Sequence, residues 1–126
     1  MIVLALVVAL VPLKFPGILV KGGFVTPTRN VACNVGPLGK GGAPAIGCSL
    51  FSASSPQGTA TWWMAATGRA HFAYAKADPA TDFRTLRYGW KYSWRGIACS
   101  SARAGLTCRN KSRHGFFLSR QKQRIF

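Results

Sequence analysis

Two histidines, His71 and His114, are the side chains in this sequence whose type best suits catalysis. Acid–base cleavage of a phosphodiester needs two groups that titrate near neutral pH, so this pair is the minimum for a ribonuclease-like hydrolase. Their surroundings favour a simpler interpretation, because His71 lies on the solvent side of an expected strand and His114 lies in an expected turn, where backbone hydrogen bonds would hold it. We therefore expect no enzyme and no catalytic residue. A small exported hydrolase of ribonuclease-like type remains the alternative.

The C-terminal part of the chain carries a dense run of basic residues. Six of them fall within sixteen residues, with Phe116 and Phe117 between: Arg109, Lys111, Arg113, Arg120, Lys122 and Arg124. Basic and aromatic side chains together are typical of a polyanion-binding face, although the two phenylalanines are better suited to the core. The sequence therefore suggests a polyanion as partner, either a cell-envelope polymer or a nucleic acid.

The whole chain shares this positive charge. Seventeen Lys and Arg oppose only Asp78 and Asp82, which gives a formal net charge of +15. Such a field attracts polyanions, although the same charge could serve only to keep a small secreted domain soluble. Glycosidases need two carboxyl groups that flank the scissile bond, and two aspartates four apart in one polar loop do not suit that chemistry.

Adjacent tryptophans, Trp62 and Trp63, lie in a β-prone segment. Neighbouring side chains of a strand point to opposite faces of its sheet, so one ring can fill the core while the other lies at the surface. An exposed ring could stack on a base or a sugar. The alternative is a partly buried platform over the neighbouring strand.

Four cysteines, Cys33, Cys48, Cys99 and Cys108, form an even set separated by 14, 50 and 8 residues. Zinc sites usually need close pairs with two to four residues between them, which these spacings do not provide. Two disulfides, with Cys33–Cys48 and Cys99–Cys108 as the favoured pairs, are therefore expected, and no metal or cofactor. Disulfides form in oxidising compartments, so we expect a protein that is secreted or held at the cell envelope. We also expect it to be a monomer.

The first residues, MIVLALVVALVPL, form an apolar run that is too short to span a bilayer. The run resembles the hydrophobic region of a signal peptide, although no basic residue precedes it. We expect residues 1–22 to be a signal peptide or a retained membrane anchor. Residues 23–126 should then form a single small β domain.

Short β-type segments recur about every ten residues, and no segment shows a sustained helical period. This pattern predicts an all-β sandwich or barrel of about seven to nine short strands, stapled by the disulfides. The clearest alternation runs from Leu86 to Trp94, where aromatic and basic residues interleave. Segments 97–100 and 106–109 should pair as a hairpin that carries Cys99 and Cys108 on its two arms. The last three residues should return an apolar end to the core.

Several motifs carry a family resemblance that extends from Phe24 to Phe126. The matching residues are Thr26-Pro27-x-x-Asn30-x-x-Cys33, Tyr88-Gly89, Gly105-Leu106-Thr107-Cys108-x-Asn110 and His114-Gly115-Phe116-Phe117-Leu118-Ser119-Arg120. The chain resembles, as a divergent member, a family of small exported actinobacterial domains of unknown function, with motifs of the types TPSGN-x-x-C, YG-x-x-W, GLTC-x-N and GHGFFLSR. The resemblance implies export and a β fold, but no activity. With the composition, it suggests a binding or structural module of the cell envelope or extracellular space.

The chain departs from the family pattern at two turns. Arg29 and Arg113 stand where the motifs have glycine, and Tyr74 stands where many members have a cysteine. A non-glycine residue with positive φ is strained. We therefore expect either different turns at these two positions or strained turns in a divergent or decaying copy of the family's domain.

Overall fold

The computed structural model describes residues 22–76 and 83–126, which form eleven strands and no helix. The expected signal or anchor segment, apart from residue 22, lies outside the described residues, as do both aspartates. Within the two described ranges, no helix is long and apolar enough to cross a membrane. The all-β class is confirmed, although there are more strands than the seven to nine predicted, because β6 and β11 have only two and three residues and show no period in the sequence.

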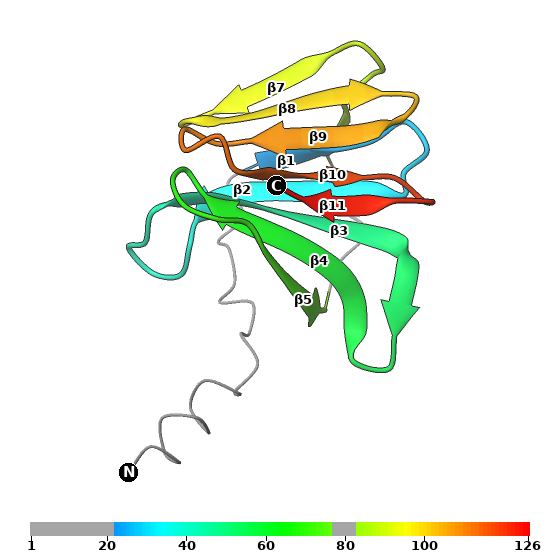
Figure 1. The fold of residues 1–126 in the computed structure, drawn as a ribbon, viewed down its shortest axis with the longest axis horizontal. Coiled ribbons are helices and arrows are strands. Elements are labelled where there is room, and N and C mark those ends of the chain that lie inside the picture. Colours follow the sequence, from blue (N-terminus) through cyan, green and yellow to red (C-terminus); the bar gives the residue numbers. More distant parts are fainter. Residues whose placement is uncertain (1–21, 77–82) are drawn as a thin grey trace.

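Six strands form the first sheet, in the order β5-β4-β3-β2-β1-β6 (Figure 1). The strands are β1 Gly22–Val25, β2 Val31–Pro37, β3 Pro44–Ser55, β4 Gly58–Ala65, β5 His71–Ala75 and β6 Arg84–Thr85. Neighbours run antiparallel except β6, which lies parallel to β1. The register of β3 on β4 shifts between Leu50 and Ser54, and such a bulge bends a strand and increases its twist.

The other five strands form an antiparallel meander in the order β11-β10-β9-β8-β7. They are β7 Lys91–Trp94, β8 Ile97–Ala102, β9 Gly105–Arg109, β10 Gly115–Leu118 and β11 Gln123–Ile125. Buried and exposed residues alternate strictly along β8, which is the period expected of a strand with one face on the core. The predicted hairpin of residues 97–100 and 106–109 is confirmed as β8 and β9.

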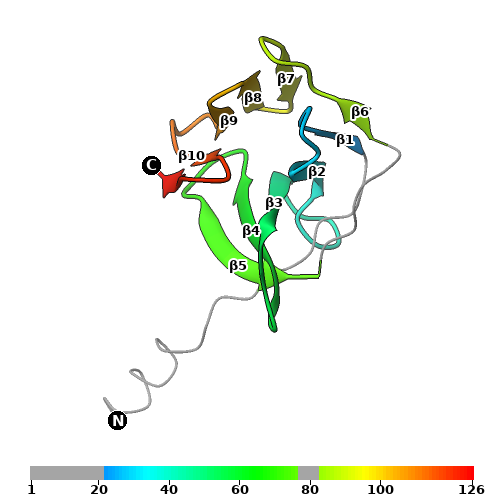
Figure 2. The ribbon, with the colours of Figure 1, turned by 90° about the vertical axis from the view of Figure 1, so that its right-hand side faces the viewer.

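The hydrophobic core lies between the two sheets, which curve around it (Figure 2). Phe24 from the first sheet and Phe116 from the second are its largest fully buried side chains. Burying an aromatic side chain of this size contributes about 1.5–3 kcal/mol to stability. Tyr92 packs against the core from β7, 4.9 Å from the Phe24 ring, and burial raises the pKa of its phenol above the usual value.

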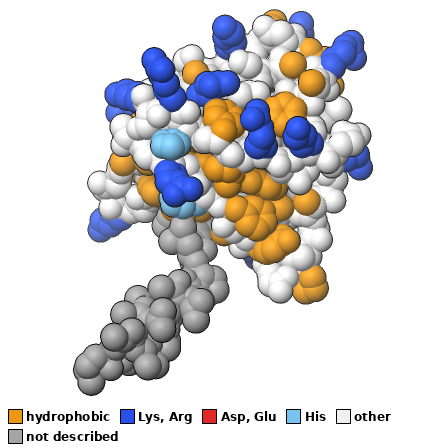
Figure 3. Space-filling view, viewed as in Figure 1, with side chains coloured by type: hydrophobic (Ala, Val, Ile, Leu, Met, Phe, Trp, Pro, Cys, Tyr) orange, Lys and Arg blue, Asp and Glu red, His pale blue; other side chains and the backbone are white. Residues whose placement is uncertain are grey.

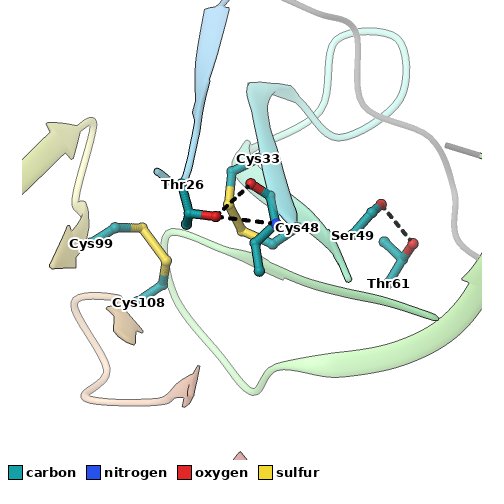
Figure 4. Close-up of a disulfide and its surroundings, with 8 residues drawn as sticks. Thr26, Cys33, Cys48, Ser49, Thr61, Cys99 and Cys108 are labelled. Atoms are coloured by element: carbon teal, nitrogen blue, oxygen red, sulfur yellow. Dashed lines mark hydrogen bonds between the residues drawn. A yellow bond between two sulfur atoms is a disulfide. The ribbon is translucent and has the colours of Figure 1, made fainter. Parts of the chain in front are cut away.

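Both disulfides lie inside this core and join strands that are directly paired (Figure 4). Cys33 of β2 faces Cys48 of β3, and Cys99 of β8 faces Cys108 of β9, with Cα separations of 4.1 and 4.0 Å. Each sheet therefore carries one bridge on its inner face. The two predicted pairings are confirmed.

One buried side chain, Asn110, ties the two sheets together at the end of β9. Its Nδ2 donates to the carbonyl oxygens of Ala65 and Gly68, at 3.0 and 2.7 Å, just past the end of β4. Its Oδ1 accepts from the backbone N–H groups of Ser112 and His114, which shapes the β9–β10 turn. The asparagine of the GLTC-x-N motif thus has a structural role.

The predicted strand from Leu86 to Trp94 is wrong in its first half. Its alternation breaks at a turn in which the N–H of Trp90 donates to the carbonyl of Arg87, and Gly89 takes a φ of +85°. Strand β7 begins only at Lys91. The backbone of Gly89 and Trp90 bonds instead to Ser101 of β8. The alternating sequence was therefore misleading, because the chain crosses here from one sheet to the other.

The two arginines at expected glycine positions do occupy strained turns. Arg29 has a φ of +62° and Arg113 a φ of +64°. In both turns the arginine N–H donates to the carbonyl three residues earlier, of Thr26 and Asn110 respectively. Of the two expected outcomes, the strained turn is therefore the one found at both positions.

Arg29→Gly and Arg113→Gly are each expected to raise the free energy of unfolding by about 1 kcal/mol, because glycine has no Cβ penalty at positive φ. The two gains should add, since the turns lie at opposite ends of the sandwich. Urea denaturation measures both. Arg29→Ala and Arg113→Ala are the matched controls, because they remove the same charge and keep the strain. Equal stability of the alanine and glycine variants would contradict the prediction.

Candidate polyanion-binding surface

The outer face of the second sheet carries the residues that alternate with its core positions. One row crosses all five strands through directly paired residues: Lys91, Ser100, Thr107, Phe117 and Arg124. Paired residues on one face lie side by side, so this row places cations at both edges of the sheet and an aromatic ring between polar neighbours. Strand pairing creates this arrangement, and no single segment of the sequence shows it.

The ring of Phe126 lies on this outer face between two guanidinium groups. The Cζ of Arg109 is 4.8 Å from the ring centroid, and the Cζ of Arg124 is 5.2 Å from it. Phe126 exchanges two backbone hydrogen bonds with Gly115, which extends the pairing of β10 and β11 to the end of the chain. A Cβ on Gly115 would come within 2.9 Å of the ring, so this glycine leaves the space that Phe126 covers. The expectation that this apolar end returns to the core is wrong.

Three further arginines of the C-terminal half lie over aromatic rings. The pairs are Arg87 on Trp90 at 5.1 Å, Arg95 on Trp94 at 5.6 Å and Arg103 on Tyr88 at 4.9 Å. No described residue is an aspartate or glutamate, because Asp78 and Asp82 fall in the undescribed segment. With no side-chain carboxylate to pair with among the described residues, a guanidinium gains most by lying on a ring face. Figure 3 shows basic side chains spread over the strands of the second sheet, interspersed with apolar ones.

The six basic residues predicted as one cluster lie in three places. Arg109 and Arg124 meet at the Phe126 ring on the outer face. Lys111 and Arg113 lie in the β9–β10 turn, and Arg120 and Lys122 lie at the other end of β10, in its turn to β11. The set therefore runs from end to end along the last strands.

Sequence reasoning missed the roles of Arg87, Arg95 and Arg103. The interleaving of basic and aromatic residues from Leu86 to Trp94 was the available signal, but it was interpreted as a strand with two separate faces. The folded turns instead bring each arginine back over a ring within a few residues or, for Arg103 and Tyr88, across neighbouring turns.

The expectation that one tryptophan of the 62–63 pair lies at the surface is wrong. Trp62 and Trp63 are both only 6% exposed. Strand β5 pairs beside them, so the ring of Phe72 packs on Trp62 at 4.9 Å and the ring of His71 lies on Trp63 at 4.4 Å. The sequence places the two rings on opposite faces correctly, but the neighbouring strand covers both.

The two histidines have structural partners. His71 lies on the Trp63 ring with an interplanar angle of 30°. The Nδ1 of His114 is 3.4 Å from the carbonyl oxygen of Phe126, and its backbone N–H donates to Asn110. The histidine side chains, pale blue in Figure 3, lie on one face of the molecule with a basic side chain between them. The paired-histidine hydrolase therefore stays a prediction.

The chain offers little for metal binding in the part that the structure describes. No group of three or more His, Cys, Asp or Glu side chains is found there. All four cysteines are taken up by the disulfides.

Residues 66–126 match the sequence model of a protein family of unknown function, DUF6636. The matched part includes the whole second sheet and all five arginine–aromatic pairs. No curated protein and no solved structure matches the chain. The expected resemblance to a family of unknown function is thus confirmed for this part of the chain, whereas the actinobacterial origin and the individual motifs stay predictions.

Proposed function

We propose that the protein is an exported binding module for polyanions, and that it has no catalytic role. The observation that carries the proposal is the Phe126 ring held between Arg109 and Arg124 on the outer face of the second sheet. All but two of the seventeen basic residues, Lys14 and Lys21, belong to the described domain, and no described aspartate or glutamate opposes them.

The geometry of this surface suits an extended anionic polymer. A guanidinium that lies on a ring keeps its N–H edges free to donate to phosphate, sulfate or carboxylate oxygens. The ring holds the side chain in place, so less conformational freedom is lost on binding. Partly exposed rings can also stack on bases or sugars. These properties support binding of a cell-envelope polymer or of nucleic acid.

Export is the second part of the proposal. Both disulfides are buried in the core and join paired strands, which supports folding in an oxidising compartment. In an oxidising compartment outside the cytoplasm, the polyanions of the cell envelope are the available partners. N-terminal sequencing of the exported protein would show whether the first 22 residues are removed.

Binding to duplex DNA of defined length tests the polyanion surface. The affinity should fall steeply with salt, and Arg109→Gln/Arg124→Gln should reduce the slope of log K against log salt by about 1.8, or about 0.9 for each lost contact. Retention on heparin should fall in parallel. Fluorescence anisotropy over a series of salt concentrations gives the slope.

The matched control is Arg69→Gln/Arg84→Gln, which removes two exposed charges outside the second sheet. Its slope should stay close to that of the unmodified protein. An equal loss in both double variants would mean that net charge alone drives binding. Salt-independent retention, or no retention, would overturn the proposed function.

A further inference from the structure

A hollow of about 240 Å³ opens at one end of the sandwich, where three turns meet. The β1–β2, β8–β9 and β10–β11 turns surround it, and Tyr88 completes the wall. These turns lie at the right-hand end of the molecule in Figure 1, and Figure 2 looks onto that end. Drug-sized ligands usually occupy larger cavities of about 300–1,000 Å³, so the hollow suits a smaller group.

The inner wall of the hollow is apolar. Val31, Leu106 and Leu118, all at least 96% buried, contribute to its lining, together with the small side chains of Ala102 and Ala104. Such a wall favours contact with a short hydrocarbon or ring over contact with water.

Two arginines, Arg103 and Arg120, also line the hollow, from different turns. Arg103 is held over the ring of Tyr88 at 4.9 Å, which fixes its position. Among the residues that the structure describes, neither guanidinium has a hydrogen-bonding or ion-pair partner. Two cations at one hollow without a nearby counter-charge favour the binding of an anion.

The other polar groups of the lining are mostly used within the turns. The Ser119 hydroxyl donates to the carbonyl of Lys122 and accepts from its N–H. The Thr26 hydroxyl bonds in the same way to both backbone groups of Val31, as Figure 4 shows for the labelled threonine. The side-chain donors left for a ligand include the two guanidinium groups, the Tyr88 and Thr28 hydroxyls and the Gln121 amide.

The walls are fixed by backbone contacts. The Tyr88 segment is bound to β8 through the hydrogen bonds of Gly89 and Trp90 with Ser101, at 2.7 and 3.0 Å. Gly105 has a φ of +152°, and a Cβ there would come within 2.6 Å of the Leu118 carbonyl oxygen, so the β8–β9 turn lies directly against β10. A site held in this way loses little freedom when a ligand binds.

We propose that this hollow is a binding site for a small organic oxyanion, a carboxylate or a phosphate monoester carried on a short apolar body. The planar forks of Arg103 and Arg120 bind the oxyanion, with the Tyr88 hydroxyl as a third donor. The apolar body lies against Ala102 and Ala104, which are the exposed apolar side chains of the lining. The site shares Arg103 and Arg120 with the basic residues described above. It does not use Phe126, Arg109 or Arg124, so it does not depend on the observation that carries the proposed polyanion function.

NMR titration of the full domain with phenyl phosphate and with benzoate tests the site. At least one of the two should bind saturably in about the millimolar range, with the largest shifts at Ala104, Gly105 and Gln121. The stronger of the two identifies the oxyanion. Benzyl alcohol, which lacks the charge, and inorganic phosphate, which lacks the apolar body, should each bind at least about tenfold more weakly.

Four variants make the test decisive. Arg103→Gln and Arg120→Gln should each weaken binding about tenfold or more, because a charge-assisted hydrogen bond is lost. Ala104→Trp should block the hollow while the charge is kept. Arg109→Gln/Arg124→Gln should leave the binding of phenyl phosphate and benzoate unchanged even if it abolishes DNA binding.

No saturable binding of either aromatic anion would overturn the inference. Binding that survives Ala104→Trp, or that inorganic phosphate matches, would do the same, since it would place the anion on the surface charge alone. Arg103 and Arg120 are both exposed, so their replacement should leave the fold intact, and the spectrum of each variant verifies this.

Discussion

Replacing Cys33 and Cys48 together with alanine is expected to lower the free energy of unfolding by about 3 kcal/mol, and the same change at Cys99 and Cys108 by about 2.6 kcal/mol. The difference follows from the sequence separations of 15 and 9 residues, because a longer closed loop restricts the unfolded chain more. Alanine is the suitable replacement, since all four positions are at most 1% exposed and serine would bury an unpaired hydroxyl.

Urea denaturation of the two double variants measures these losses. A small domain has a total stability of about 5–15 kcal/mol, so removing both bridges should leave a protein that is marginally folded at best. Reduction of the unmodified protein should also be slow and should accelerate in urea, because a reductant reaches the buried sulfurs only when the core opens. If the protein without both disulfides were as stable as the unmodified protein, the prediction that the two bridges stabilise the core would be wrong.

Asn110→Ala is the second change with a large expected effect, a loss of about 3 kcal/mol. Four hydrogen bonds end on this side chain, and each contributes about 1 kcal/mol net, with an added cost where a buried partner is left unpaired. The loss should affect the contact between the sheets as well as the β9–β10 turn. Thermal unfolding measures the total loss of stability. Hydrogen exchange of the Ala66–Gly68 segment measures the loss of the contact between the sheets.

Asn110→Asp separates these two roles. Aspartate keeps the oxygen that accepts from Ser112 and His114, but it turns the donor toward Ala65 and Gly68 into a second acceptor. Its carboxylate would face two carbonyl oxygens, so its pKa in the folded state should be raised. The variant should therefore be most stable below the ordinary aspartate pKa of about 3.9 and should lose stability as the pH rises through the folded-state value. If the difference in stability between Asn110→Asp and Asn110→Ala did not change with pH, this explanation would be wrong.

Predictions from the sequence succeeded where short-range chemistry decides the structure. The two disulfide pairings follow from strands that are close in the chain, and the β8–β9 hairpin follows from an alternating pattern around a glycine turn. Strain at Arg29 and Arg113 was one of two outcomes that the sequence left open, and both turns are closed by a local hydrogen bond to the third residue before.

The sequence predictions that were wrong share a different cause. The pattern from Leu86 to Trp94 looks like a strand, yet backbone bonds to Ser101 stop it at Trp90. The burial of the Trp62–Trp63 pair depends on β5 lying beside β4. The partners of both contacts are near in the chain, but the local alternation does not show which segments pair with each other.

The sequence by itself determined the all-β class, the disulfide framework and the excess of positive charge, because period, cysteine spacing and composition are properties of the chain. Only the tertiary structure decided where that charge lies. The Phe126 ring meets Arg109 and Arg124 through the pairing of β9, β10 and β11, and Arg103 and Arg120 meet at one hollow through the convergence of separate turns. A binding surface on a sheet is made from residues of neighbouring strands, and strand order is settled by the burial of the core that the two sheets share.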